Sequence, residues 1–166
     1  MGISYELAPD IQEKVNEIAK LLFKHVKLDS VVCIRSYGSS SRGTIARCHA
    51  LGKAMQIALG RRGFYVIEVI SKRFDKMPEI DKTKTLIHEL MHIPKSFGGG
   101  FIHHNVVHEE NVERVYEHYV NLKRKEKFIY DFLNKNENQK SNIDEKSIDD
   151  NKRESFTVKK KKNWWF

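Results

Sequence analysis

The chain has 166 residues, of which 40% are hydrophobic and 31% are charged, as in a globular protein with one main domain. Its formal net charge of +8 favours an anionic partner such as nucleic acid or an anionic membrane surface, without identifying one. The start of the chain lacks a signal-peptide pattern, and no run approaches the roughly 20 apolar residues of a membrane span. We therefore expect a cytoplasmic protein without a transmembrane segment.

The first predicted helix follows Pro9. Apolar residues recur at steps of three and four, as on the buried face of a helix, at Ile11, Val15, Ile18, Leu22 and Val26. Val31–Ser36 is short and β-branched, which predicts a strand, and Thr44–Ala50 could pair back with it across a glycine- and serine-rich loop. Such a hairpin would bring Cys33 near Cys48. Free thiols are expected in a reducing cytoplasm, but this pairing leaves a disulfide open.

The remaining predicted elements are three helices and one strand. Leu51–Leu59 favours a short helix, and the alternation in Tyr65–Ile70 is typical of a strand. Lys82–Ile93 predicts a helix that ends before Pro94, and a longer helix runs from about Glu109 to Leu133. These elements predict an α+β fold with a small, mainly antiparallel sheet and flanking helices.

The composition changes after Leu133. Residues 134–155 are almost free of apolar side chains and rich in Asn, Lys, Asp and Ser, which cannot bury enough surface to fold. We therefore expect a folded domain over residues 1–133 and a disordered polar linker over residues 134–166. The linker ends in the basic and aromatic tail Lys159–Phe166, which could bind nucleic acid, a membrane surface or a partner protein.

The predicted helix Lys82–Ile93 carries the pattern H-E-x-x-H. Residues four apart lie on one face of a helix, so His88 and His92 can offer two imidazole nitrogens to one zinc ion. Glu89 would lie beside the ion, where its carboxylate can take a proton from a zinc-bound water as that water attacks a peptide carbonyl. This pattern predicts His88 and His92 as metal ligands and Glu89 as the general base.

A catalytic zinc site usually has a third protein ligand. Pro94 and the three following glycines allow the chain to turn back and bring His103 or His104 to the ion. A carboxylate from the next helix is the alternative, and the candidates are Glu109, Glu110, Glu113 and Glu117. The spacing H-E-x-x-H-x-x-G-x-x-H is absent because Lys95 stands where it requires glycine, which argues against the metzincin arrangement.

The run KTLIHELMHIPKSFGGGFIHHN, preceded by YVIEVISKRFD, resembles a family of zinc metallopeptidases inferred in archaea and phages. Their pattern is roughly H-E-L-x-H-I-P-x-x-F-x-G-x-L-R-x-H, and the similarity covers about Val31 to Asn105. The resemblance implies a zincin-like fold, and it places His104 as the third metal ligand. The chain departs from the pattern at Ile102, where the family favours arginine, so any role of that arginine is vacant or has moved.

We therefore predict a zinc-dependent metallopeptidase that acts on a peptide or protein substrate, with zinc held by His88, His92 and His104 and with Glu89 as base. Two alternatives come from other classes. A zinc-binding domain without catalysis would keep the histidines, although it would not need Glu89. A nucleic-acid-associated protein would use the basic tail, for instance as a SprT-like protease acting on DNA-bound proteins.

Overall fold

The computed structural model describes the backbone of residues 2–161 and the side chains as far as residue 135. The chain divides into two compact units, residues 1–122 and residues 123–166, which are described separately. The first unit contains the sheet and the residues of the candidate site.

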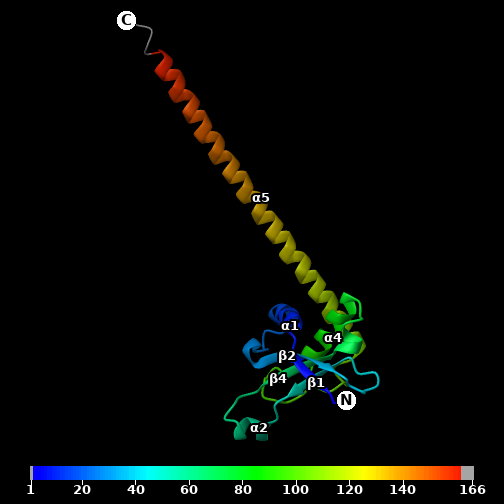
Figure 1. The fold of residues 1–166 in the computed structure, drawn as a ribbon. Helices are drawn as coiled ribbons and strands as arrows, with labels where there is room; N and C mark the ends of the chain where they lie inside the picture. Colours follow the sequence, from blue (N-terminus) through cyan, green and yellow to red (C-terminus); the bar gives the residue numbers. More distant parts are fainter. Residues whose placement is uncertain (1, 162–166) are drawn as a thin grey trace. The chain divides into compact units, whose positions relative to one another are not determined.

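The sheet of the first unit has four strands: β1 (Ser4–Leu7), β2 (Val31–Tyr37), β3 (Ala46–Ala50) and β4 (Tyr65–Ile70). They lie in the order β1-β2-β4-β3. Strands β1, β2 and β4 are labelled in Figure 1. The β1–β2 and β4–β3 pairs are antiparallel, whereas the central β2–β4 pair is parallel. The predicted α+β fold with a small, mainly antiparallel sheet is thus confirmed.

The predicted hairpin between Val31–Ser36 and Thr44–Ala50 is wrong. Strand β3 pairs with β4 instead, and β4 lies between β2 and β3. The physical reason is the burial of β4, of which five of the six residues are buried, as is typical of a central strand with neighbours on both sides. Cys33 and Cys48 therefore both lie opposite Ile67 with a strand between them, and both are free thiols.

Within residues 2–161, six helices connect and flank the strands. They are α1 (Pro9–Leu22), the 3-10 helix η1 (Leu28–Ser30), α2 (Lys53–Ala58), α3 (Ser71–Phe74), α4 (Glu79–Met91) and α5 (Glu109–Lys161). The four predicted helices are present as α1, α2, α4 and α5, with ends that differ by a few residues except at the end of α5. Strand β1 was not predicted, because all four of its residues are exposed and it shows no buried alternation.

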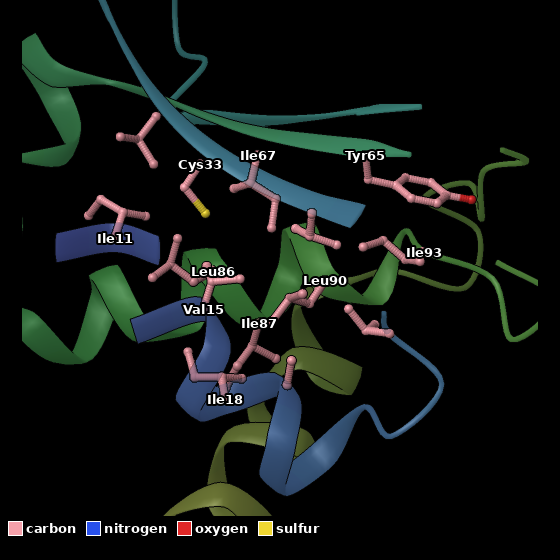
Figure 2. Close-up of a cluster of buried hydrophobic side chains, with 14 of the residues drawn as sticks. Ile11, Val15, Ile18, Cys33, Tyr65, Ile67, Leu86, Ile87, Leu90 and Ile93 are labelled. Carbon is pink, nitrogen blue, oxygen red and sulfur yellow. The ribbon is translucent and has the colours of Figure 1, made fainter. Parts of the chain in front are cut away.

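The hydrophobic core lies between the sheet and helices α1 and α4. Ile11, Val15 and Ile18 of α1 meet Leu86, Ile87 and Leu90 of α4 beneath the strand residues Cys33 and Ile67, as Figure 2 shows. Each of these side chains is at most 6% exposed. Full burial of an aliphatic side chain of this size stabilises a fold by about 1.5–3 kcal/mol. The buried face of α4 is thereby fixed against the sheet, and its opposite face is left for His88.

Helix α5 begins in the first unit, where Val112 and Tyr119 contribute to the core. Its backbone is helical as far as Lys161, beyond the predicted end near Leu133. The division into a domain of residues 1–133 and a disordered linker of residues 134–166 stays a prediction. Of the tail Lys159–Phe166, residues 162–166 lie outside the described part of the chain. Within the part that is described, no helix combines the length and the apolar character needed to cross a membrane.

Candidate metal centre

Helix α4 carries the H-E-x-x-H pattern on rigid backbone. It begins after Pro78, and Glu79 and Asp81 lie in its first turn, where carboxylates interact favourably with the helix dipole. It ends at Met91, with His92 as the C-terminal cap residue, ahead of Pro94. His88 and His92 are thus separated by one turn, and their rings lie edge to face with centroids 4.8 Å apart. The last turn of the helix therefore presents both imidazoles together.

The segment after α4 brings a third histidine to this pair. The ring of His104 lies 5.3 Å from that of His88 and 4.7 Å from that of His92, centroid to centroid. One nitrogen of each of the three residues lies within 4.8 Å of the others, so this group could hold a metal ion. His104 is exposed, whereas His92 is only 2% exposed. The structure thereby brings together the three histidines that the sequence indicated.

Hydrogen bonds orient two of these rings. Nδ1 of His92 lies 2.5 Å from the carbonyl oxygen of Ile102, so Nδ1 carries the hydrogen and donates it. Nδ1 of His104 faces the Val107 carbonyl oxygen at 3.4 Å, a longer contact with the same consequence. In both residues Nε2 then holds the lone pair that a metal needs. Hydrogen bonds of this kind from a ligand histidine to a backbone carbonyl are typical of metal sites.

Phe101 adds a contact that the sequence did not indicate. Its ring stacks on that of His92, with centroids 4.3 Å apart and planes 14° apart. The same ring contacts His103 edge to face, with centroids 5.8 Å apart. An aromatic residue in a glycine-rich loop has no spacing rule that would assign it to a histidine, so only the folded chain reveals this contact.

Glu89 lies next to the cluster and is only 6% exposed. Burial raises the pKa of its carboxyl group to about 7, and a hydrogen bond from the backbone N–H of Cys48 opposes that rise. Cys48 belongs to the edge strand β3, so this N–H comes from the strand that lies beside α4. A carboxyl group with such a pKa can take up and release a proton near neutral pH.

Two of the three clustered histidines, His88 and His92, have lowered pKa values. Burial, together with the neighbouring His92 and His104, lowers the pKa of His88 to about 4. Burial also lowers the pKa of His92, against the opposing effect of the hydrogen bond to Ile102. A neutral imidazole is the form that coordinates a metal, so no deprotonation has to precede binding near pH 7.

The cluster opens into a cleft of about 810 Å³. One wall is formed by β3, which begins at Ala46, and by the preceding residues Thr44 and Ile45. The other wall is formed by α4 and the start of α5. Apolar side chains such as Met77 and Val112 share the lining with charged ones such as Arg47 and Lys84. Because β3 is an edge strand, its outer edge has no strand partner, and it lies along one side of the cleft.

The alternative third ligands are not part of the histidine group. His103 is exposed and contacts Phe101. Among the glutamates, Glu109 and Glu113 line the cleft, and Glu113 is paired with Lys84 at 2.5 Å. Neither Glu110 nor Glu117 lines the cleft, and both are exposed. Over the described residues, the three-residue group that could hold a metal contains His104 and none of these alternatives.

Comparison with known proteins identifies the chain at the level of a family. The family model described as "putative phage metallopeptidase" matches residues 3–125, which include the sheet, α4 and all three clustered histidines. A search of the curated proteins found no match, and a search of the solved structures found none either.

Proposed function

The chain belongs to the putative phage metallopeptidase family, and from this premise we propose that it hydrolyses peptide bonds with a zinc ion held by His88, His92 and His104. The observation that carries the proposal is the convergence of three imidazole nitrogens within 4.8 Å beside the buried carboxylate of Glu89. A glutamate is not required to bind the metal. Its burial next to three potential ligands therefore supports a catalytic centre over a zinc site that only stabilises the fold.

The donor set supports zinc in particular. Three neutral imidazoles and a free position for solvent are a common arrangement of catalytic zinc. Calcium and magnesium prefer oxygen ligands instead, which the cluster does not offer. Copper and nickel also accept imidazole, so the metal content of the purified protein is part of the test below.

When bound, zinc would act as a Lewis acid that polarises the substrate carbonyl and makes water a stronger acid. Glu89 would accept a proton from the attacking water and pass it to the nitrogen of the departing amine. Its burial and its hydrogen bond from the Cys48 backbone N–H hold the carboxylate in one orientation. His92 and His104 would continue to donate their Nδ1 hydrogens to backbone carbonyl oxygens. These hydrogen bonds fix the direction in which each Nε2 points.

The substrate proposed for the cleft is an extended peptide. Strand β3 forms one wall and has an unpaired edge, and an extended peptide can add to such an edge through main-chain hydrogen bonds. The cleft volume of about 810 Å³ is enough for several residues of a peptide chain. Apolar and charged lining residues would contact the side chains on either side of the scissile bond.

Metal analysis and peptide hydrolysis together test the proposal. Wild-type protein, purified without chelator, is expected to hold about one zinc per chain and to cleave a library of unstructured peptides. Glu89→Gln is expected to keep the zinc and to lose hydrolysis by at least about 100-fold, since a positioned general base contributes about 10²–10⁴-fold. The matched control is Glu117→Gln, at an exposed position outside the cleft. Wild type without metal, or a Glu89→Gln variant as active as wild type, would contradict the proposal.

A further inference from the structure

The segment after α4 has to hold His104 in place although it is rich in glycine. Pro94 follows shortly after the end of α4, and Gly98, Gly99 and Gly100 precede the histidine. Three adjacent glycines lose more backbone entropy on ordering than any other residues, so by themselves they would leave a loop poorly fixed. Contacts from elsewhere in the chain therefore have to fix the path of residues 97–100, called here the ligand loop.

Tyr65 provides the first of these contacts. Its side chain is fully buried, and its hydroxyl makes two hydrogen bonds with the ligand loop. The hydroxyl accepts one from the backbone N–H of Gly99 at 3.0 Å and donates one to the carbonyl oxygen of Gly100 at 3.0 Å. The ring also packs against that of Phe97, centroid to centroid at 4.9 Å. Because Tyr65 begins β4, the loop is joined directly to an interior strand of the sheet.

Gln56 provides the second contact, from the other side. It is the buried residue of α2, with 5% of its surface exposed. Its side-chain nitrogen donates to the carbonyl oxygens of Leu51, at 2.7 Å, and Gly98, at 2.8 Å. Both hydrogens of the amide nitrogen are therefore donated, one to Leu51 just before α2 and one to Gly98 in the ligand loop.

The ligand loop packs closely against the backbone around α2. A Cβ atom added to Gly99 would lie 2.0 Å from the Gln56 side-chain nitrogen and 2.2 Å from the Leu51 oxygen. A Cβ atom on Gly63 would lie 2.2 Å from the carbonyl oxygen of Phe97. The ligand loop is thus in close contact with the chain on both sides of α2.

The far end of this segment is fixed to the metal cluster. Ile102 donates its backbone N–H to the carbonyl oxygen of His92 at 2.9 Å and accepts the Nδ1 hydrogen of the same residue. His104 follows two residues later. The path from Tyr65 and Gln56 to the cluster therefore runs through five residues of chain, residues 98–102, with hydrogen bonds at both ends.

We propose that Tyr65 and Gln56 are positioning residues for metal binding, which hold the ligand loop so that His104 faces His88 and His92. Neither residue belongs to the histidine cluster or lines the cleft, and both act through the backbone of residues 98–100. The inference rests on the proposed metal site. It adds to that site two residues which lie far from the H-E-x-x-H pattern in the sequence.

The test measures metal affinity in the full chain by competition with a zinc indicator dye. Tyr65→Phe removes only the hydroxyl, and it is expected to weaken zinc binding about 10-fold or more, the range found when a supporting hydrogen bond behind a metal ligand is lost. Gln56→Met removes the amide donors at similar length and provides a second variant if the first is poorly folded. The control is Tyr37→Phe, at the 38% exposed end of β2. Circular dichroism of each metal-free variant establishes that it is folded at the assay temperature.

A double-mutant cycle separates positioning from general stability. If Tyr65 acts through His104, Tyr65→Phe is expected to weaken metal binding in the wild-type background and to have little further effect when His104 is already alanine. Cobalt(II) absorption gives a second readout, because a displaced ligand changes the visible spectrum whereas a uniformly less stable protein does not.

The outcomes distinguish the inference from the proposed function. Wild type that binds no metal would overturn both. Wild type that binds zinc, together with Tyr65→Phe and Gln56→Met variants that bind it as tightly as Tyr37→Phe does, would overturn the inference alone. An equal loss of affinity with and without His104 would also overturn it, since the effect would then not pass through that ligand.

Discussion

His92 and Ile102 are joined by two hydrogen bonds in opposite directions. The Ile102 N–H donates to the His92 carbonyl oxygen at 2.9 Å, and the His92 Nδ1 hydrogen is donated to the Ile102 carbonyl oxygen at 2.5 Å. This pair fixes the chain just before the adjacent residues His103 and His104. Of these two residues, His104 belongs to the three-nitrogen group, whereas His103 is exposed and contacts Phe101.

Alanine substitutions of these adjacent histidines are expected to differ in their effect on zinc binding. His104→Ala removes a member of the three-nitrogen group and should lower zinc affinity at least about 100-fold, with loss of peptide hydrolysis. His103→Ala removes an exposed side chain that contacts Phe101, and it should change zinc affinity by less than about 3-fold. Isothermal titration of the metal-free proteins with zinc compares the two. The reverse order of effects would assign His103 as the third ligand.

Cys33 and Cys48 are expected to remain free under oxidising conditions. They lie opposite the same residue of β4, on strands to either side of it. Two strand spacings amount to about 9–10 Å, whereas a disulfide needs Cα atoms within about 7 Å. After prolonged air oxidation and denaturation, thiol titration should therefore find both cysteines reduced. A fragment linked through these two cysteines in non-reducing peptide mapping would contradict the observed strand order.

This strand order shows where prediction from the sequence ends. Val31–Ser36 and Tyr65–Ile70 have the residue types of strands, and both were predicted nearly to the residue. Which strands pair with each other could not be predicted in the same way, because strands joined by a local hairpin and strands joined by a crossover connection have similar residue types. The burial of both faces of β4 decided between them, and burial is a property of the folded chain.

The residues of the candidate site also differ in how far the sequence predicts them. The roles of His88, Glu89 and His92 could be predicted from the sequence, because the regular period of a helix places residues four apart on one face. His104 followed from resemblance to a family and not from any periodicity. Tyr65 and Gln56 had no signal at all, since a tyrosine in a strand and a glutamine in a short helix are ordinary residues until the chain folds. Contacts between distant segments are the part of a site that local patterns do not encode.

Stability is expected to fall in acid through the pair of Asp10 and Arg35. Their side chains form two hydrogen bonds of 2.7 Å, and the hydrogen bond from Arg35 is the main reason that the pKa of Asp10 is lowered from 3.8 to about 2. A carboxyl group whose pKa is lower in the folded state stabilises the fold above its unfolded pKa. That contribution is lost as the pH falls from about 4 toward 2.

Urea unfolding at several pH values measures this effect. Because the Asp10 side chain is 60% exposed, the contribution is expected to be below about 1 kcal/mol. Asp10→Asn should lower the free energy of unfolding at pH 6 by that amount and should be indistinguishable from wild type near pH 2. Asp29→Asn, at an exposed position in η1, serves as the control. An Asp10→Asn variant with the same pH dependence as wild type would show that the pair contributes nothing measurable.

Adjacent glycines of the ligand loop give the sharpest test of its packing. Gly99 has a φ of +85°, and an added Cβ would lie 2.0 Å from the Gln56 side-chain nitrogen. The left-handed backbone costs about 1–2 kcal/mol for an alanine and overpacking a further 1–3 kcal/mol, so Gly99→Ala is expected to destabilise the fold by about 2–5 kcal/mol. An added Cβ on Gly98 would meet only the Ser96 hydroxyl, at 3.7 Å. Gly98→Ala should therefore stay within about 0.5 kcal/mol of wild type in urea unfolding. Equal stability of the two variants would mean that the loop is free to move away from Gln56, and the anchoring of His104 through this loop would then have no packing basis.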